Sequence, residues 1–371
     1  MSKSQGVAPL SERSDATVFL NGEYIPADQA RIGVATHGFS YGTGCFEGIR
    51  AYYNSEADQL YVFRALEHFE RLHRSCRIMN IKLPWSAEEL VDITTELIRR
   101  NGLRKDCYLR PFAYKADEII GVKLNDLRDD FMMLVIPMGD YVSTAGLRCI
   151  VSSWRRIDDN MIPARAKISG AYVNSAFAKS EALMSGFDEA IMLTSEGHVS
   201  EGSAENLFMV IEGEIVTPPP SENILQGITR DTIMELARHE LGTPVRERVI
   251  DRTELYVADE IFLTGTGAQI APVVEVDHRP VGAGVVGPVA SQFQRLYREV
   301  TRGKRLEYAS WLTAVYSTPT AVIANGHNGH NGHLHADDKA TEKSKVKGKA
   351  KSSEKSAKSK VARAEKVGSL N

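Results

Sequence analysis

One lysine in the segment RAKISGAYVNSAFAKSEA is a candidate for chemistry. Lys179 lies inside a run that reads as an ordinary helix. Lys167 precedes that run, and the small residues Ser169 to Ala171 and then Tyr172 follow it, which leaves little bulk around its amine. Most lysines are surface charges that keep a protein in solution, so a solvated side chain is the alternative to a reactive amine.

Acidic residues and glycine-containing turns downstream supply groups that could act with such an amine. HVSEGSAENLF places Glu201 and Glu205 just before an apolar strand, where a carboxylate needs a partner to stay ionised. LQGITRD opens a helix at residues 227–229, and LTGTGAQIAPV contains a second glycine–threonine turn at 265–267. Free N–H groups at such positions bind anions. These groups fit a cofactor with an aldehyde, a basic ring nitrogen and a phosphate, and pyridoxal phosphate has all three.

Five motifs give the chain a family resemblance. HGFSYGTGCFEGIRAY, RAKISGAY, SEGSAENLF, GITRD and LTGTGAQIAPV occur in the order and at the spacing of the class IV (fold type IV) pyridoxal-phosphate aminotransferases. Over residues 17–312 the chain resembles the branched-chain amino acid aminotransferases most closely. The resemblance implies transamination between branched-chain L-amino acids (Leu, Ile, Val) and 2-oxoglutarate, which yields branched-chain 2-oxo acids and L-glutamate.

The resemblance also implies which residues bind the cofactor. Lys167 would be the Schiff-base lysine, and its amine, when neutral, would move the substrate proton. Glu201 would face the pyridine nitrogen and keep it protonated. Tyr172 would hydrogen-bond the cofactor's O3′. Four residues would bind the phosphate through a guanidinium, backbone amides and hydroxyl groups: Arg71, Ile228, Thr229 and Thr266.

Each of these roles has a structural alternative. Without the motifs, Glu201 reads as a surface or capping carboxylate, and Tyr172 reads as an aromatic side chain packed on the inner face of a helix. Glu205 is the better candidate for a purely structural carboxylate. If Arg71 binds the phosphate, three neighbouring arginines are expected to be solvated: Arg64, Arg74 and Arg77.

The substrate groups implied by the resemblance lie elsewhere in the chain. The turn at Thr266 and Gly267 would bind the α-carboxylate, and Arg110 would bind the distal carboxylate of glutamate at the edge of an apolar pocket. Three side chains would line that pocket: Phe46, Tyr108 and Tyr141. Tyr41 would reach into the site of a neighbouring subunit, so the expected assembly is a homodimer or a dimer of dimers that binds amino acids and 2-oxo acids.

The elements that must position these residues mix hairpins with helices. Asn21-Gly22 between apolar runs predicts a type I′ hairpin. Ser86 and Glu89 form a possible capping box for a helix that stops at Gly102. Strands are expected at 107–114, 130–138, 147–154, 188–194, 206–211, 245–250 and 259–265, and helices at 229–241 and 288–303, of which the last closes the folded body. One helical stripe is apolar: Leu66, Phe69, Leu72, Cys76 and Met79.

This order of elements predicts an α+β (mixed α/β) fold with two domains. Residues 1–15 are expected to be flexible, 16–140 to form a small α/β domain, and 147–316 to form a large domain that binds pyridoxal phosphate, after a short connector. Residues 318–371 have too little apolar surface to fold and are expected to be a disordered, basic tail.

Composition restricts the class of protein and its location. The chain has 371 residues, 43% hydrophobic and 25% charged, as in soluble globular proteins. The formal net charge is −3, but eleven basic and five acidic residues from Ser317 onward leave −9 on the rest. The four cysteines show no C-x-x-C pair, and no secretory signal or membrane span is visible. A cytoplasmic protein without a membrane or specific nucleic-acid partner is expected.

Other functions remain open at this level. A D-amino acid aminotransferase or an aminodeoxychorismate lyase would share the fold, although FEGIR and YLRPF favour the branched-chain enzyme. A binding protein acting through the basic tail is the alternative outside enzymes. The G-x-G-x-x-G match in GAGVVG lacks the strand and acid of a dinucleotide site and reads as a turn. His68 and His73 are five apart, the wrong spacing for one metal-binding helix face.

Overall fold

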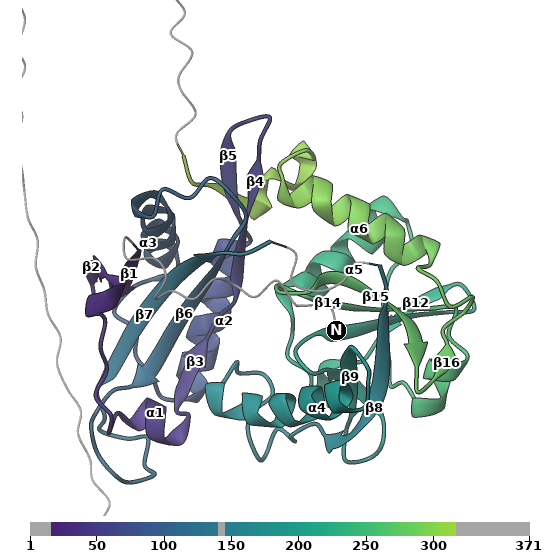
Figure 1. The fold of residues 1–371 in the computed structure, drawn as a ribbon, viewed down its shortest axis with the longest axis horizontal. Coiled ribbons are helices and arrows are strands. Elements are labelled where there is room, and N and C mark those ends of the chain that lie inside the picture. The colour runs from purple at the N-terminus through teal and green to yellow at the C-terminus, as the bar shows by residue number, and fades with distance from the viewer. Residues whose placement is uncertain (1–15, 140–144, 317–371) are drawn as a thin grey trace, which may run out of the picture. The chain divides into compact units, whose positions relative to one another are not determined.

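The computed structural model describes residues 16–139 and 145–316, all of which lie within one compact unit (Figure 1). Its strands form two sheets flanked by helices, so the predicted α+β class is confirmed. None of the helices in these ranges is long and apolar enough to cross a membrane. The N-terminal segment, Tyr141 and the basic tail lie outside the described residues.

The first sheet is antiparallel, and its eight described strands run in the order β17-β5-β4-β6-β7-β1-β2, with β3 paired to β6. Two helices cover one face, α2 (Ala65–Ile78) and α3 (Ala87–Arg100), and the short α1 (His37–Tyr41) packs near β6. The strands are β1 (Thr17–Leu20), β2 (Glu23–Pro26), β3 (Gly44–Phe46), β4 (Ile49–Asn54), β5 (Gln59–Phe63), β6 (Cys107–Lys115), β7 (Asp129–Pro137) and β17 (Leu312–Ala314).

Local signals in the first sheet are confirmed where they concern neighbouring residues. Asn21 and Gly22 both have positive φ between β1 and β2, as a type I′ turn requires. The Ser86 hydroxyl accepts from the Glu89 amide while the Glu89 side chain accepts from the Ser86 amide, which forms the capping box of α3. Gly102, with φ +58°, follows the end of that helix.

The second sheet is mixed, with nine described strands in the order β10-β9-β8-β15-β14-β11-β12-β13 and β16 paired to β15. The helices α4 (Tyr172–Met184), α5 (Ile228–Glu240) and α6 (Pro288–Thr301) flank it. The strands are β8 (Leu147–Arg155), β9 (Glu189–Leu193), β10 (Val199–Gly202), β11 (Asn206–Ile211), β12 (Glu214–Thr217), β13 (Arg246–Glu247), β14 (Glu260–Gly265), β15 (Gln269–Val276) and β16 (Arg279–Pro280).

Alternation along β14 shows how this sheet buries both faces. Phe262 packs with α5 and α6 in one core cluster, whereas Ile261 and Leu263 belong to another cluster on the opposite face. Successive side chains of a strand point to opposite faces of its sheet. Because both faces are buried, the ends of β14 and of its neighbours are fixed firmly, and these ends carry the turns that the motifs predict.

Three expectations about the elements are wrong. The chain continues beyond α6, and β17 returns to the first sheet to pair with β5. Leu66 is 38% exposed although the rest of its predicted stripe is buried, because the buried face at the start of α2 is formed by Ala65, His68 and Phe69. The strand expected at 245–250 shortens to β13. The predicted division into domains at 16–140 and 147–316 stays a prediction.

Candidate active site

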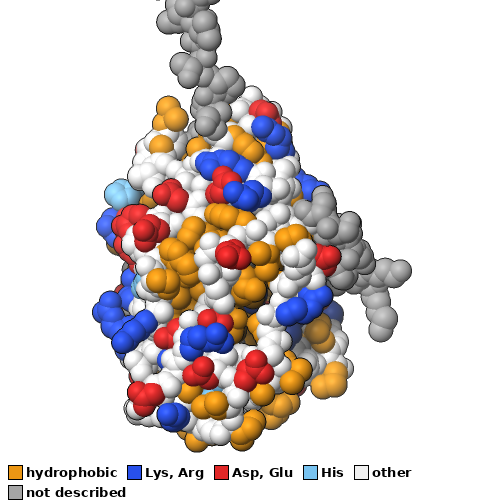
Figure 2. Space-filling view, turned by 90° about the vertical axis from the view of Figure 1, so that its left-hand side faces the viewer, with side chains coloured by type: hydrophobic (Ala, Val, Ile, Leu, Met, Phe, Trp, Pro, Cys, Tyr) orange, Lys and Arg blue, Asp and Glu red, His pale blue; other side chains and the backbone are white. Residues whose placement is uncertain are grey.

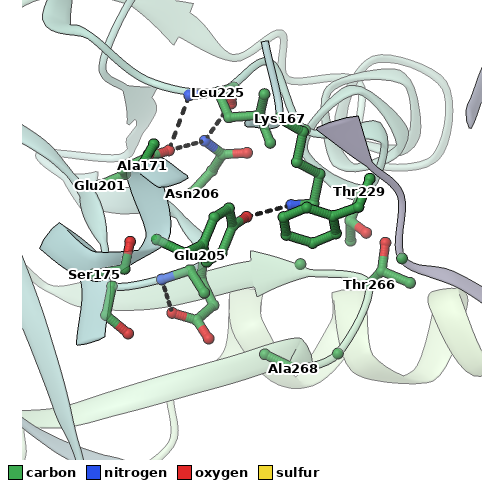
Figure 3. Close-up of a pocket in the computed structure, with 18 of the residues that line it drawn as sticks. Lys167, Ala171, Ser175, Glu201, Glu205, Asn206, Leu225, Thr229, Thr266 and Ala268 are labelled. Carbon is green, nitrogen blue, oxygen red and sulfur yellow. Dashed lines mark hydrogen bonds between the residues drawn. The ribbon is translucent and has the colours of Figure 1, made fainter. Parts of the chain in front are cut away.

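Most of the predicted site residues meet at one cavity of about 350 Å³. It is lined by residues of both sheets, by the segment before α4 and by the start of α5 (Figure 3). The predicted residues that line it are Phe46, Arg71, Tyr108, Arg110, Lys167, Tyr172, Glu201, Ile228, Thr229, Thr266 and Gly267. The sequence separates these residues by more than 200 positions, and the fold brings them together.

Lys167 enters the cavity from a segment that the first sheet holds in place. Its carbonyl accepts from the Phe46 amide at 3.0 Å, and its own amide donates to the Ser75 hydroxyl at 3.1 Å. The side-chain nitrogen donates to the Tyr172 hydroxyl at 2.5 Å (Figure 3). No carboxylate pairs with this amine among the described residues. Lys167 is therefore a restrained amine beside a phenol, not a solvated surface lysine.

Glu201 lies in β10, a strand that the sequence does not predict, and its carboxylate is buried against polar partners. Arg156 approaches one oxygen at 2.9 Å. The other oxygen accepts from the Asn206 side chain at 3.0 Å and from the Leu225 amide at 3.1 Å. Burial raises the pKa of Glu201, and the Arg156 guanidinium opposes that rise. A further positive charge beside this carboxyl would therefore stabilise its anion strongly.

Glu205 lies four residues further on and has a different environment. One carboxylate oxygen accepts from the Ala204 amide at 3.0 Å, and no cation pairs with it among the described residues. Burial, and then the nearby Glu189 carboxylate, raise the pKa of Glu205 to about 8. A carboxyl group with this pKa is mostly protonated at neutral pH, which supports a structural role for Glu205. Glu201, which pairs with Arg156, is the better candidate for the anionic group of the cavity.

The start of α5 offers free N–H groups to the cavity. Its N-cap, Gly227, provides no side-chain cap, and Ile228 and Thr229 line the cavity directly after it. A Cβ at residue 227 would collide with the Asn206 amide oxygen, so glycine is required by the close approach of Asn206. The uncapped helix N-terminus, with its dipole, forms an anion site.

Arg71 lies in α2 and reaches the same end of the cavity. Its guanidinium forms a two-point ion pair with the fully buried Glu47, at 2.7 and 2.8 Å, and donates to the Gln226 carbonyl at 2.9 Å. His68 also contacts Glu47, at 2.8 Å. Although burial opposes it, Arg71 and His68 together hold the pKa of Glu47 well below its usual range. Three of the five N–H donors of Arg71 are used, and two remain for an anion.

The turn after β14 and one strand residue supply further polar groups. Thr266, Gly267 and Ala268 line the cavity where β14 turns into β15. The buried Thr264 hydroxyl also faces this wall and has no hydrogen-bond partner among the described residues. Buried hydroxyl groups are normally paired, so an unpaired one beside a cavity indicates a ligand group that completes it.

The opposite wall comes from the first sheet and is aromatic. Phe46 packs edge-on against Tyr172, with ring centroids 4.7 Å apart. Arg110 lies over the Phe46 ring at 4.5 Å and donates twice to the Tyr108 hydroxyl, at 3.0 and 2.7 Å. No carboxylate pairs with Arg110 among the described residues. This wall combines apolar surface with one unpaired cation.

One predicted substrate residue does not line this cavity, and another lies outside the described residues. Tyr41 is 37% exposed at the end of α1, and its hydroxyl accepts from the Gly121 amide at 3.0 Å. It does not line the cavity of its own chain. Tyr141 lies outside the described residues, and its place in the pocket stays a prediction.

Sequence reasoning missed three polar residues around the site. Asn206 and Arg156 hold Glu201. Asn206 lies inside the motif SEGSAENLF, which is the signal that could have identified it, whereas Arg156 follows β8 outside the motifs. Arg64, expected to be solvated, is buried and contacts Asp231 at 2.8 Å, so that expectation is wrong. Arg74 and Arg77 are exposed as expected.

These groups fit pyridoxal phosphate, the cofactor implied by the resemblance. An amine beside a phenol suits its aldehyde and O3′, and a buried carboxylate suits its ring nitrogen. The uncapped start of α5 and the spare donors of Arg71 suit its phosphate. The arrangement brings a restrained amine, an anion and an anion site together, as amino-group transfer at an aldehyde requires.

Comparisons with known proteins agree with this geometry. Residues 44–276 match the family model of amino-transferase class IV. A probable branched-chain-amino-acid aminotransferase of Aquifex aeolicus is 50% identical over 299 residues, which cover 80% of this chain and 96% of the relative.

Two solved structures of similar proteins show the same fold. The branched-chain aminotransferase of Thermoproteus uzoniensis with norvaline is 43% identical, with a TM-score of 0.78, and the alignment covers 81% of this chain and 99% of that one. The branched-chain amino acid aminotransferase of Thermobaculum terrenum in its PLP form is 36% identical, with a TM-score of 0.79, and the alignment covers 82% and 99% of the two chains.

Proposed function

Because the chain belongs to the class IV aminotransferases, we propose that it transfers amino groups between branched-chain L-amino acids and 2-oxoglutarate with pyridoxal phosphate as its cofactor. The products are branched-chain 2-oxo acids and L-glutamate. The observation that carries the proposal is the meeting of Lys167, Tyr172 and Glu201 in one cavity that also holds an uncapped helix start.

The cofactor-binding residues are proposed from their place in the cavity. When bound, pyridoxal phosphate supplies an aldehyde carbon that accepts the amino group and an electron-poor ring that draws electron density from the substrate's Cα–H bond. Lys167 holds the aldehyde end and Tyr172 the O3′ oxygen. Glu201 faces the ring nitrogen. Arg71, Ile228, Thr229 and Thr266 would hold the phosphate, at the start of α5 and the turn after β14.

Proton movement is assigned to Lys167. The amine would accept the proton from substrate Cα and release it to the cofactor's aldehyde carbon, so it must be neutral for part of the cycle. Tyr172, at 2.5 Å, restrains the amine and limits its rotation. Glu201 does not move; its partners Arg156 and Asn206 keep its carboxylate in one orientation.

Substrate selection is assigned to the turn after β14 and to the aromatic wall from the first sheet. The Thr266–Gly267 turn offers N–H groups to the α-carboxylate that both substrates carry. Phe46 and Tyr108 contact the aliphatic side chain of leucine, isoleucine or valine, and Tyr141 is proposed to complete this pocket. Arg110, with no carboxylate of its own, receives the distal carboxylate of 2-oxoglutarate or glutamate.

A homodimer is proposed as the working assembly, with Tyr41 of each chain at the site of its neighbour. Figure 2 shows hydrophobic side chains gathered across the face at the left of Figure 1, where the first sheet and α1 lie. Exposed apolar residues on the segments around α1 include Val34, Phe39, Ile120 and Val122. Such surface usually marks an interface. A cytoplasmic location is also proposed, supported by four cysteines, all of them among the described residues, that form no disulfide.

The function is tested on the purified chain in two ways. Initial rates with 2-oxoglutarate and L-leucine, isoleucine or valine should exceed the rate with D-alanine, and no aminodeoxychorismate cleavage is expected. Borohydride treatment of the protein with pyridoxal phosphate should leave a pyridoxyl group on the peptide that contains Lys167, seen by mass spectrometry. Activity confined to D-alanine, or a Lys167→Ala protein that still transaminates leucine at the original rate, would refute the proposal.

A further inference from the structure

Arg64 has a backbone conformation that its residue type disfavours. It lies directly before α2, with φ 48° and ψ 43° in the left-handed region. A residue with a Cβ is held there only when its surroundings fix it, and such residues concentrate at functional sites. The Arg64 amide donates to the Trp311 carbonyl at 2.7 Å, and the guanidinium lies over the Trp311 ring at 5.0 Å.

The side chain of Arg64 crosses from the first sheet to the first turn of α5. One terminal nitrogen contacts the Asp231 carboxylate at 2.8 Å and donates to the Thr232 hydroxyl at 3.0 Å. The Nε group donates to Glu67, at 2.8 Å, in the first turn of its own helix. Arg64 is thus buried between two helices and connects their N-terminal turns, without lining the cavity itself.

Arg64 contacts the first turn of α5 from the side that faces away from the cavity. Ile228 and Thr229 come directly before its contacts at Asp231 and Thr232 in the same helix. Arg71, two helical turns after Arg64 in α2, holds the preceding carbonyl of Gln226. The loop and first turn that present the N–H groups are therefore fixed from behind by two arginines of one helix face.

Charge gives Arg64 a second effect on this turn. Asp231 is an acidic residue in the first turn of α5, where its negative charge interacts favourably with the helix dipole. The same charge repels an anion bound at the N-terminus. The Arg64 guanidinium compensates it at 2.8 Å, so the helix start keeps its attraction for a phosphate.

We propose that Arg64 is a positioning residue for the phosphate group of the cofactor, acting through the first turn of α5. This inference rests on the proposed function, since it takes the start of α5 as the phosphate site. Arg64 makes no contact with the cofactor. It fixes the direction of the Ile228 and Thr229 amides and cancels the charge of Asp231.

The test compares two ligands that differ only in the phosphate. The Kd values of pyridoxal phosphate and of pyridoxal are measured on the cofactor-free full chain by absorbance titration. For Arg64→Gln, we expect the Kd of pyridoxal phosphate to rise about tenfold while that of pyridoxal changes less than about twofold. Arg64→Lys keeps the charge but cannot contact both helices as the guanidinium does, so its Kd for pyridoxal phosphate should lie between those of the wild type and Arg64→Gln. Arg74→Gln, an exposed arginine of the same helix, is the matched control and should match the wild type.

A second substitution separates charge from folding. Asp231→Asn added to Arg64→Gln should recover part of the lost affinity for pyridoxal phosphate. Equal losses for both ligands, or an unchanged ratio of their Kd values, would overturn the inference, and Arg64→Lys decides the matter if Arg64→Gln does not fold. A wild-type chain that binds neither ligand at Lys167 would instead refute the proposed function.

Discussion

The wall that the second sheet gives to the cavity differs from the wall given by the first sheet in how its charged groups are held. Glu201 has three partners, from a strand end, a neighbouring strand and a loop. Among the described residues, the partners of Arg110, across the cavity, are the Tyr108 hydroxyl and the Phe46 and Tyr108 rings. A fully paired group keeps one position, whereas a group with spare donors can take a ligand.

This difference matches the two tasks of an aminotransferase. The cofactor stays in place through both halves of the reaction, so the groups that hold it need one fixed geometry. The substrates alternate between an aliphatic chain and a carboxylate, so the opposite wall must accept both. In the proposed function, the aromatic surface of Phe46 and Tyr108 serves the first, and the guanidinium of Arg110 serves the second.

The largest expected effect comes from changing the wall of the second sheet, where Glu201 is held in one position (the fixed wall). Glu201→Gln keeps the shape of the side chain but removes its charge, and in the proposed function the ring nitrogen would lose its anionic partner. We expect kcat for leucine and 2-oxoglutarate to fall about 10²–10³-fold at saturating cofactor. Glu205→Gln, four residues away, is the matched comparison and should lower kcat less than about tenfold. Equal losses in the two variants would remove the distinction between these carboxyl groups.

The next effect concerns stability and sharpens the contrast between the same two carboxyl groups. Because the pKa of Glu205 is raised to about 8 on folding, the folded protein holds a proton that the unfolded chain releases near its ordinary pKa. This contribution to stability is complete below the unfolded pKa and is lost as the pH rises through 8. Glu205→Gln cannot titrate. Its stability relative to the wild type should therefore rise by about 4 kcal/mol between pH 5 and pH 9.

Urea unfolding at several pH values measures this difference. Glu196→Gln, an exposed carboxyl variant in the same half of the chain, serves as the control and should show no comparable trend. A difference between Glu205→Gln and the wild type that stays constant with pH would mean that Glu205 is ionised in the folded protein.

A substitution of Arg110 tests the wall of the first sheet, which must accept two kinds of substrate (the adaptable wall), and should have a smaller and selective effect. Arg110→Met keeps much of the aliphatic contact and removes the unpaired guanidinium. We expect kcat/KM for 2-oxoglutarate to fall roughly 10–100-fold, because a charged hydrogen-bond partner is lost, while the half-reaction with leucine changes less than about threefold. The two half-reactions are measured separately from the absorbance of the bound cofactor. Parallel losses in both would place Arg110 in the fixed machinery instead.

The sequence predicts those parts of this site whose signals are local. Lys167 and Tyr172 are five residues apart in one motif, and the structure brings them within 2.5 Å. The glycine turns and the capping box of α3 also depend on neighbours in the chain. Such patterns are readable because the residues that interact are close in sequence.

The remaining features depend on contacts between distant segments. Arg64 is buried because α5 and Trp311, both far along the chain, cover it. The three residues of β17 carry little pattern of their own, and their strand exists because β5 pairs with them. Asn206 holds the Leu225 carbonyl as well as Glu201, a bond that only the folded loop creates. Propensity and periodicity contain no information about such partners.

The smallest effect expected lies within the adaptable wall itself. Tyr108 is the only hydrogen-bond partner of Arg110 among the described residues, and its buried hydroxyl, whose pKa burial raises, accepts two bonds from the guanidinium. Tyr108→Phe removes that acceptor and leaves the ring. We expect KM for 2-oxoglutarate to rise about fivefold, as for the loss of one ordinary hydrogen bond, with KM for leucine unchanged. Gly48→Ala perturbs the same hydroxyl from the other side, because a Cβ there would lie 2.6 Å from it, and should give the same selective change. If both variants instead raise KM for leucine, Tyr108 acts as apolar wall and not as the support of Arg110.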